Sequence, residues 1–324
     1  MHDDQDSPIL TNHEHDAPSN PGRRRTLLGA GTLAVAAFVP SALRSAWAED
    51  GHGQPSLFPL GVASGDPGPD SVVLWTRLAP DPLNGGGFGQ AVAAVDWRVA
   101  SDPAMTRVLA RGRVLATAAN GHAVQVPVRG LRPDRWYYYQ FEHRGVKSRI
   151  GRTRTFPAAT ALPTQMRFAL VSCQDLQAGY FAAYRDIAAQ ELDFVLHVGD
   201  YIYEYAGDPA TPTARRHVGP EIESVADYRN RYAQYRLDAQ LQAAHAAFPF
   251  IVTFDDHEVD NNYAALIPED NQTAQAFFAR RSNAYQVYRE TMPLALRGQA
   301  PAGSLNLYRQ LSYGRLAELL VLDT

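Results

Sequence analysis

The segment Phe194-Val-Leu-His-Val-Gly-Asp200-Tyr-Ile-Tyr203 gives the strongest indication of the fold class of this chain. A short apolar run that ends at a turn residue predicts a buried strand, here Phe194–Val198. Gly199 allows the backbone to turn sharply, so that the Asp200 carboxylate can point outward past the end of the strand. In open α/β sheets, ligands bind beyond the carboxyl ends of the strands. The stretch therefore predicts an α/β fold with Asp200 at its functional edge.

Two other segments repeat this arrangement. The segment Met166–Cys173 is a predicted strand that ends at the single cysteine of the chain, and the segment Phe250–Glu258 ends in Asp-Asp-His-Glu. A thiolate, a phenolate at Tyr203 and several carboxylates at one sheet edge cost free energy unless a cation neutralises them. Together, the three segments predict a metal-dependent hydrolase.

The residue types at this edge indicate a mixed metal centre. The Asp200 carboxylate can bridge two cations, as a two-metal hydrolase requires. The phenolate of Tyr203 suits a ferric ion, and the Cys173 thiolate favours a transition metal over a hard cation. Asp256 supplies a carboxylate for a second ion, and Asp255 is a further candidate ligand.

Neighbouring residues complete the predicted site. His257 carries an imidazole that can donate a proton to a leaving oxygen. Glu258 is expected to orient its neighbours from outside the ligand set. The side-chain amides of Asn261 and Asn262 offer oxygen ligands of the kind that calcium accepts. His257 is therefore the predicted catalytic residue, and the other three support the metal centre.

Each of these residues also has an ordinary structural explanation. A cysteine at a strand end is commonly a small core residue, Gly-Asp is commonly a turn, and Asp-Asp-His-Glu can be a solvated loop or a helix N-cap. Asn261-Asn262 can form a turn, and His197 can be a satisfied core histidine. Tyr203 and Tyr205 can be packing aromatics. The joint occurrence of these residues in strand-end order favours the metal site.

A loop rich in Pro and Thr follows the Asp200 motif and carries Arg215, Arg216 and His217. These side chains can contact an anionic substrate, or the loop can be an ordinary surface loop. The sequence leaves both possibilities open.

Residues 58–156 show a different pattern, of short strands separated by turns. Turn signals about every ten residues indicate a small antiparallel sandwich. The segment Leu131–Tyr137 resembles the tyrosine corner of fibronectin type III modules, and Pro157–Pro163 is a predicted linker. The predicted strands are Ser71–Leu78, Ala94–Ala100, Arg107–Ala116, Ala123–Val128, Trp136–Glu142 and Arg152–Phe156.

From Met166 onward, strands and helices alternate, which indicates an α/β layer fold. The last predicted strand, Leu316–Leu322, is apolar on both faces and should have neighbours on each side. The chain is therefore expected to be truncated within this domain. The predicted helices are Tyr180–Leu192, Val225–Leu237, Ala239–Ala247 and Thr273–Thr291, and the other late strand is Leu305–Leu311.

The N-terminus, residues 1–48, is typical of a targeting segment. Arg24-Arg25 precedes an apolar run through Val39, and Ala46-Trp47-Ala48 is a small-residue cleavage site. The run is too short to span a bilayer, and the paired arginines favour the twin-arginine route over an ordinary secretory signal or a membrane anchor. We therefore expect export by the twin-arginine translocase, to the periplasm or as a secreted protein, without a membrane span in the mature chain.

The composition excludes some classes of function. A formal net charge of −4 without a basic stripe disfavours nucleic-acid binding. Lys147 is the only lysine, which disfavours Schiff-base chemistry. With one cysteine the chain cannot form an internal disulfide, and an exposed thiol in an oxidising compartment would be prone to oxidation. Cys173 is therefore expected to be buried or bound to metal.

Five motifs resemble those of PhoD-type alkaline phosphatases, which are calcineurin-like metallophosphatases. They are Phe58–Pro67, Val73–Leu78, Ser172–Gln174, Gly199–Glu204 and Phe254–Glu258. The resemblance implies a PhoD N-terminal β-sandwich domain, fibronectin III-like, at residues 55–157. It further implies a PhoD-like metallophosphatase domain, a calcineurin-like α/β sandwich, at residues 164–324, of which the chain would hold the N-terminal part.

The resemblance also implies roles for individual residues. The family has a centre of Fe(3+) and Ca(2+), with Cys173 and Tyr203 as iron ligands and Asp200 as the bridge by position. Asp256 occupies the place of a metal-binding asparagine in related phosphatases, and His257 that of their catalytic histidine. The family supplies further Asp and His ligands from a segment that this sequence lacks.

The predicted function is an exported phosphatase that hydrolyses phosphate monoesters and diesters. A metal-bound hydroxide is the expected nucleophile, and His257 would protonate the leaving alkoxide. Two alternatives stay open. One is a phospholipase D-like phosphodiesterase of lipid or cell-wall polymers, and the other is an inactive fragment whose sandwich acts as an interaction module.

Overall fold

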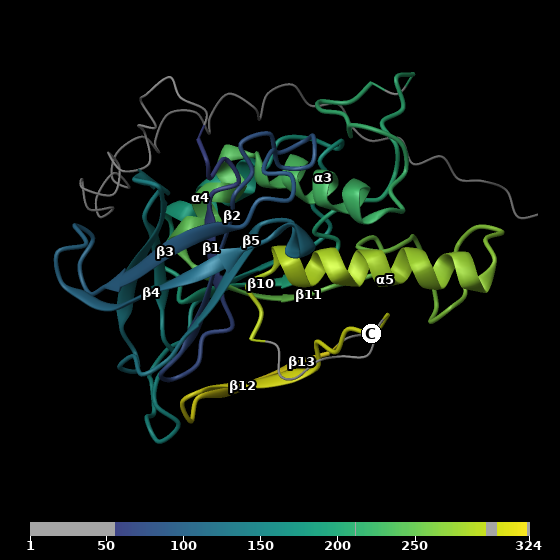
Figure 1. Cartoon of the computed structure of the whole chain (residues 1–324). Coiled ribbons are helices and arrows are strands. Elements are labelled where there is room, and N and C mark those ends of the chain that lie inside the picture. The colour runs from purple at the N-terminus through teal and green to yellow at the C-terminus, as the bar shows by residue number, and fades with distance from the viewer. Residues whose placement is uncertain (1–55, 211, 296–302, 323–324) are drawn as a thin grey trace, which may run out of the picture. The chain divides into compact units, whose positions relative to one another are not determined.

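The computed structural model describes residues 56–210, 212–295 and 303–322 (Figure 1). All the described residues belong to one compact unit of the chain. The predicted leader at residues 1–48, with Arg24-Arg25 and its cleavage site, lies outside the described residues. Among the described helices, none combines the length and the apolar character needed to cross a membrane.

A six-stranded sheet runs through both halves of the described sequence. In spatial order its strands are β5 (Ala123–Val128), β2 (Val72–Arg77), β1 (Val62–Gly65), β11 (Pro249–Thr253), β10 (Phe194–Val198) and β9 (Phe168–Val171). The pairs β5–β2 and β2–β1 are antiparallel, whereas β1–β11, β11–β10 and β10–β9 are parallel. Strand β1 joins the two parts, because Ser64 pairs with Pro249 and Gly65 with Phe250.

A second, antiparallel sheet packs against β1, β2 and β5. It consists of β4 (Val108–Ala116), β3 (Ala93–Ala100), β6 (Trp136–His143) and β7 (Val146–Lys147), with β8 (Gly151–Arg154) also paired to β6. Leu74 and Val126 of the first sheet share a buried core with Val95 and Phe141 of the second. This is the predicted antiparallel sandwich. Its likeness to fibronectin type III and the domain limits 55–157 and 164–324 stay predictions.

Tyr137 ties the start of β6 to the turn before it. Its buried hydroxyl accepts a hydrogen bond from the Arg132 N–H at 2.8 Å and donates one to the Arg132 carbonyl at 3.0 Å. A buried tyrosine bonded to the backbone a few residues upstream is the arrangement of a tyrosine corner. The local contact that the sequence predicts is therefore present.

Four α-helices of the described chain pack on one face of β10 and β11. They are α2 (Ala182–Ala189), α3 (Val225–Arg236), α4 (Ala239–Ala247) and α5 (Ala274–Thr291), and a short 3-10 helix, η1 (Ala118–Asn120), lies outside this group. Helix α3 begins at a capping box in which Ser224 and Asp227 bond to each other's backbone N–H groups. Val195, Phe250 and Val252 of the strands join the core that the helices form.

The opposite face of β10 and β11 packs against an antiparallel hairpin of β12 (Arg309–Tyr313) and β13 (Ala317–Val321). Phe194 and Ile251 of the sheet form one buried cluster with Tyr313 and Val321 of the hairpin. Successive residues of a strand point to opposite faces, so the two strands serve both layers at once. Helices on one face and strands on the other give the layered α/β arrangement that the sequence predicts.

The end of the chain differs from the prediction in two respects. The predicted strand Leu305–Leu311 is observed as β12, which begins at Arg309. Leu305 and Leu307 precede it in coil, because their side chains pack into the core that the helices form. The predicted strand Leu316–Leu322 is present as β13, but it has neighbours on one side only. Within the described residues β13 pairs with β12 alone, and Leu320 is 58% exposed on the face of the hairpin that points away from the sheet.

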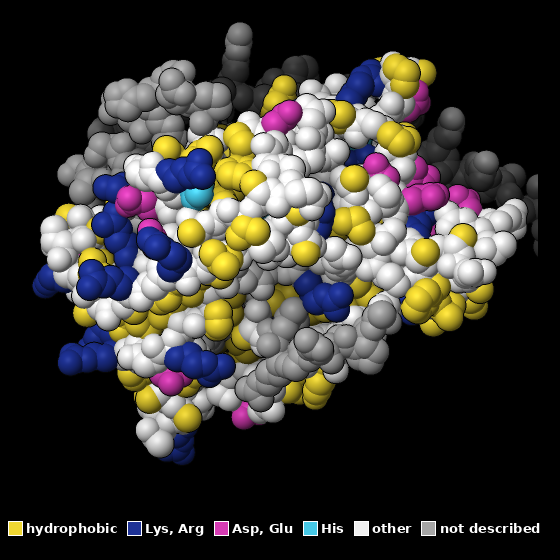
Figure 2. Space-filling view, in the orientation of Figure 1, with side chains coloured by type: hydrophobic (Ala, Val, Ile, Leu, Met, Phe, Trp, Pro, Cys, Tyr) yellow, Lys and Arg dark blue, Asp and Glu magenta, His cyan; other side chains and the backbone are white. Residues whose placement is uncertain are grey.

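Charges of both signs occur on the surface. In Figure 2, basic side chains stand beside acidic ones on the side where Figure 1 shows β3 and β4. In these strands Arg113 pairs with Asp96 at 2.7 Å, and Arg98 lies 3.8 Å from Glu142 of β6. The charges on this face are therefore mixed.

Candidate metal centre

Three loops that follow β9, β10 and β11 meet at one edge of the sheet. The parallel pairing of these strands places their carboxyl ends side by side. The Cys173 N–H donates to the Gly199 carbonyl at 3.2 Å, and the Gln174 N–H donates to the Asp200 carbonyl at 3.1 Å. Both Cys173 and Asp200 have a φ of 53°. Such left-handed conformations are uncommon for residues with a side chain, although Asp tolerates them better than Cys, and they cluster at functional sites.

Gly199 sets the spacing between the second and third loops. Its φ is 106°, a conformation that side-chain-bearing residues rarely adopt. A Cβ atom at this position would lie 2.4 Å from the backbone nitrogen of Asp255. The approach of the Asp200 loop to the Asp255 loop therefore depends on glycine.

Asp200, Asp256 and His257 come together at this edge. Each offers one possible ligand atom, and these atoms all lie within 4.8 Å of one another. The Asp200 Oδ2 accepts a hydrogen bond from the Tyr203 hydroxyl at 3.3 Å. The Asp200 Oδ1 is buried and has no hydrogen-bond partner among the described residues. A buried carboxylate oxygen without a donor is unfavourable, and a bound cation would satisfy it.

Cys173 and Tyr203 face the same carboxylate. A hydrogen bond from Ser172 lowers the pKa of the Cys173 thiol, but partial burial and the Asp200 carboxylate outweigh it, so the thiol pKa is raised. Burial, followed by the charges of Asp200 and Cys173, raises the pKa of Tyr203 well above its usual range. The protein alone thus disfavours a thiolate and a phenolate here, and a multivalent cation would reverse this preference.

Cys173 does not meet one part of its prediction. The sequence leads us to expect a thiol that is buried or bound to metal, yet the residue is exposed. The reason is its position on a loop at the sheet edge, beyond the packed part of β9. The core-residue alternative is therefore wrong, and the metal-bound alternative stays a prediction.

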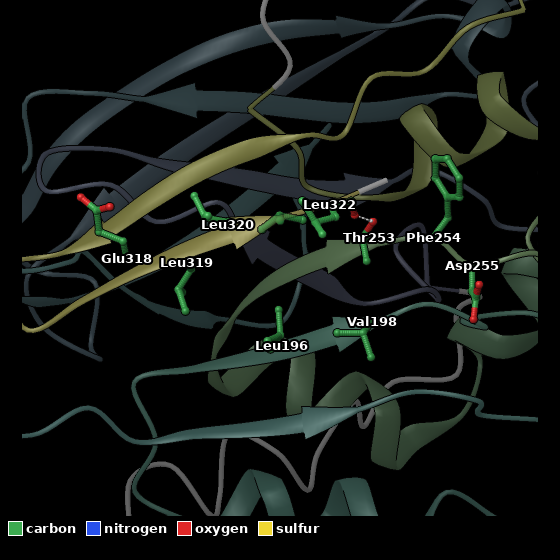
Figure 3. Close-up of a pocket in the computed structure, with 10 residues that line it drawn as sticks. Leu196, Val198, Thr253, Phe254, Asp255, Glu318, Leu319, Leu320 and Leu322 are labelled. Carbon is green, nitrogen blue, oxygen red and sulfur yellow. Dashed lines mark hydrogen bonds between the residues drawn. The ribbon is translucent and has the colours of Figure 1, made fainter. Parts of the chain in front are cut away.

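Asp255 lies at the end of a groove between the sheet and the hairpin (Figure 3). Leu196 and Val198 of β10 and Leu319 and Val321 of β13 line this groove, so it is mainly apolar. Burial and then the carboxylates of Asp200 and Asp256 raise the pKa of Asp255. Its carboxylate adds to the concentration of negative charge at the sheet edge, and its role as a ligand stays a prediction.

Glu258 connects the loops that carry the candidate ligands. Its carboxylate is buried and accepts three backbone N–H groups, from Asp200 at 3.1 Å, Tyr201 at 2.6 Å and Asp255 at 2.9 Å. Burial raises the pKa of Glu258 to about 8 despite these donors. The geometry fits the predicted role of Glu258 in orienting its neighbours.

The two asparagines serve the loop that carries Asp256. The Asn262 N–H donates to the Asp256 Oδ2 at 2.6 Å, from a residue with a φ of 53°. The Asn261 side-chain amide donates to Glu269. These contacts agree with the turn interpretation of Asn261-Asn262, and metal ligation by their amide oxygens stays a prediction.

His257 has a partner that the sequence analysis does not identify. Its Nδ1 lies 2.8 Å from the Glu204 Oε2, and Glu204 is fully buried. The Tyr203 and Tyr205 rings lie against the imidazole, with centroids at 4.1 Å and 5.4 Å. Burial lowers the pKa of His257, but Glu204 outweighs it and the result is a pKa of about 9. A signal was available, because Glu204 is an acidic residue inside the aromatic run Tyr201–Tyr205.

A second acidic group lies next to the first and differs from it in kind. Glu204, Asp260 and Glu269 place carboxylate oxygens within 4.8 Å of one another. Protein groups already hold two of its members, since Arg280 lies 2.9 Å from Asp260 in a buried ion pair and Asn261 donates to Glu269. We interpret Asp260 and Glu269 as part of the structural framework.

The loop with Arg215, Arg216 and His217 is held by the protein. His217 is buried, with its Nδ1 2.8 Å from the Tyr205 carbonyl and its Nε2 2.9 Å from the Tyr235 hydroxyl. Arg215 forms an ion pair with Asp238 at 2.7 Å. The surface-loop interpretation is therefore wrong for His217. His197 is a core histidine at 1% exposure, as one of its two interpretations predicts.

Comparison with known proteins gives consistent results along the chain. The model of the family "PhoD-like phosphatase" matches residues 168–324, and the model "PhoD-like phosphatase, N-terminal domain" matches residues 44–157. The chain is 47% identical over 309 residues to alkaline phosphatase D of Bacillus subtilis (strain 168), covering 93% of this chain and 53% of that protein.

A solved structure of PhoD agrees with this result. It superimposes with a TM-score of 0.81 and 49% identity, over 84% of this chain and 53% of that one. The chain thus spans about half the length of these relatives. Because the matched segments include the loops with Cys173, Asp200 and Asp256, the chain belongs to the PhoD-like phosphatase family.

Proposed function

We propose that this chain is an exported metal-dependent phosphatase that hydrolyses phosphate monoesters and diesters. Two observations carry the proposal: the buried Oδ1 of Asp200 has no hydrogen-bond partner among the described residues, and Asp200 offers a carboxylate oxygen within 4.8 Å of ligand atoms from Asp256 and His257. The similarity to alkaline phosphatase D supports the class of substrate. Arg24-Arg25 supports export by the twin-arginine translocase to the periplasm or beyond.

The donor set fits two kinds of cation. Cys173 and Tyr203 would hold Fe(3+), which suits thiolate and phenolate ligands. Asp256, with Asp255 beside it, would hold Ca(2+), which prefers carboxylate oxygens. Asp200 would be shared between the ions, because one of its oxygens faces Tyr203 and the other is unpartnered.

The chemistry divides between the ions and the side chains. When bound, the ions would activate a water molecule and neutralise the oxygens of the phosphate ester. His257 lies beside the carboxylates of Asp200 and Asp256, where it can give a proton to the leaving oxygen. Glu258 keeps the two ligand-bearing loops in register through the three N–H groups that it accepts.

Metal content and spectroscopy test the proposal. The mature chain is purified, its iron and calcium are measured by elemental analysis, and its visible spectrum is recorded before turnover of bis(p-nitrophenyl) phosphate is assayed. We expect bound iron, an iron–tyrosinate absorption band and calcium-dependent turnover. Tyr203→Phe should abolish the band, and Tyr205→Phe is the matched control because Tyr205 packs on the same imidazole.

The other outcomes are equally informative. Full activity in a colourless, iron-free protein would remove the iron assignment. Absence of both metal and turnover would favour the interaction module over the enzyme. Turnover confined to lipid or polymer diesters would favour the phospholipase D-like alternative.

A further inference from the structure

We propose that Glu204 is the positioning residue for His257, fixing the imidazole so that its Nε2 faces the reacting ester. The proposal rests on the proposed phosphatase function for its kinetic consequence. The contact itself can be tested independently of that function. Neither the family motifs nor the strand-end pattern assigns a role to Glu204.

The geometry defines which imidazole nitrogen of His257 is bonded to Glu204. The Glu204 Oε2 lies 2.8 Å from the His257 Nδ1, and a carboxylate oxygen can only accept. The proton at this contact therefore belongs to Nδ1, which leaves Nε2 as the nitrogen that can exchange a proton with a substrate. An imidazole whose second nitrogen is held by a carboxylate keeps one orientation and one tautomer.

Glu204 is itself fixed at both oxygens. Its Oε1 accepts the N–H of Asn261 at 3.0 Å, and its side chain is fully buried. Glu204 follows β10, whereas His257 and Asn261 follow β11, so the carboxylate spans two loops. The Tyr203 ring, 4.1 Å from the imidazole between centroids, limits rotation of His257. The imidazole is therefore held by a rigid set of contacts.

A purely structural role explains these contacts less well. The loop after β11 is already fastened by the buried Arg280–Asp260 ion pair and by the bond from Asn261 to Glu269. A further buried carboxylate close to Asp260 and Glu269 adds like charge, which is unfavourable unless a cationic partner compensates for it. Among the groups bonded to Glu204, the His257 imidazole is the one that can carry positive charge.

The dependence of kcat on the leaving group distinguishes a positioning role of Glu204 from a structural one. Glu204→Gln keeps the shape of the side chain but removes its charge, and Glu269→Gln is the matched control from the same acidic group. p-Nitrophenolate leaves readily without a proton, whereas an alkoxide needs one. Because a general acid contributes roughly 10²–10⁴-fold, we expect Glu204→Gln to lower kcat on glycerol 2-phosphate at least about tenfold more than kcat on p-nitrophenyl phosphate, with KM little changed.

A spectroscopic measurement tests the contact without turnover. In the full chain labelled with ¹⁵N-histidine and supplied with calcium alone, the His257 Nδ1–H should give a strongly downfield proton signal. This signal should be lost or moved upfield in Glu204→Gln, kept in Glu269→Gln and partly restored in Glu204→Asp.

Each result decides the proposal. Equal losses of kcat on both esters, or a wild-type spectrum without the downfield proton, would overturn the positioning role. If the wild-type chain has no turnover but shows the downfield proton with the expected response to the variants, the contact stands and the proposed function fails. Failure of the positioning role can thus be distinguished from failure of the proposed function. The wild-type spectrum tests the Glu204–His257 contact even if Glu204→Gln does not fold.

Discussion

Replacing Glu258 measures how strongly one carboxylate holds the loops of the site together. Glu258→Ala leaves the N–H groups of Asp200, Tyr201 and Asp255 without their acceptor, in a place where the residue is 1% exposed. Each buried N–H left unsatisfied costs about 1–3 kcal/mol. We therefore expect the free energy of unfolding to fall by about 3 kcal/mol or more.

The matched variant Glu258→Gln separates hydrogen bonding from the loss of the carboxyl group. The Gln oxygen can replace the Oε2, which accepts from Asp200 and Asp255, and leaves only the Tyr201 N–H unpaired. Both variants remove the carboxyl group, so the difference between them reports the hydrogen bonds and the volume of the side chain. We expect Glu258→Ala to be less stable than Glu258→Gln by about 2 kcal/mol.

Urea unfolding followed by tryptophan fluorescence gives these free energies, and hydrogen exchange locates the change. The control is Glu191→Gln, whose side chain is 76% exposed and should change stability by less than about 0.5 kcal/mol. Amides of the Asp200 and Asp255 loops should exchange faster in Glu258→Ala than in Glu258→Gln. Equal stability of the two Glu258 variants would refute the role of these three hydrogen bonds.

Three further changes test other parts of the structure by urea unfolding. Burial lowers the pKa of His197 to about 3, below its unfolded value, so His197 contributes stability that is present above about pH 6.5 and falls by about 2 kcal/mol between pH 7 and pH 5. Burial also lowers the pKa values of His217 and His245, so His197→Asn should reduce the total loss of stability over this range by about 2 kcal/mol, and an unchanged slope would contradict the assignment. Tyr137→Phe removes both bonds to the Arg132 backbone and should cost about 1–3 kcal/mol; a loss below about 0.5 kcal/mol would mean that water replaces the hydroxyl. Gly199→Ala combines a φ of 106° with a Cβ 2.4 Å from the Asp255 nitrogen, so it should cost more than about 2 kcal/mol, and wild-type stability would show that the loops can separate freely.

Elements with a strong local signal could be predicted from the sequence. Strand β5 (Ala123–Val128) and helix α4 (Ala239–Ala247) have the predicted bounds, and α3 ends at Arg236, one residue before the prediction. These segments carry their own periodicity and caps, such as Asp238, which accepts backbone N–H groups at the start of α4. The bounds of such elements are therefore set mainly by local interactions within the segment.

Elements stabilised by distant partners could not be predicted in this way. Strand β1 (Val62–Gly65) has four residues and no period long enough to detect, and it is held by β2 on one side and β11 on the other. The apolar pattern of Leu316–Leu322 indicates neighbours on each side, but within the described residues the hairpin packs on the sheet with one face only, and Leu320 on the other face is exposed. In both cases the deciding contact lies outside the segment.

The candidate site was predictable to the extent that strand ends define it. Asp200, Asp256 and His257 meet because parallel neighbouring strands bring their ends together, which the strand-end order already indicates. Glu204 was missed because its partner His257 comes from a different strand, and no short motif contains both residues. Metal binding by Cys173 depends on which ion is present. The residue type therefore indicates the kind of ligand that is offered, a thiolate, and not the ion that it binds.

The parallel pairing of β1 with β11 also bears on how the molecule acquires its structure. Ser64 and Pro249 are far apart along the chain, so a ribosome must release most of the described sequence before this part of the sheet can close. An isolated N-terminal segment would present β1 as an open strand edge, which invites pairing with other chains. The sandwich and the layer that carries the candidate metal site should therefore mature as one cooperative unit, with completion of the site and closure of the sheet occurring in the same late folding step.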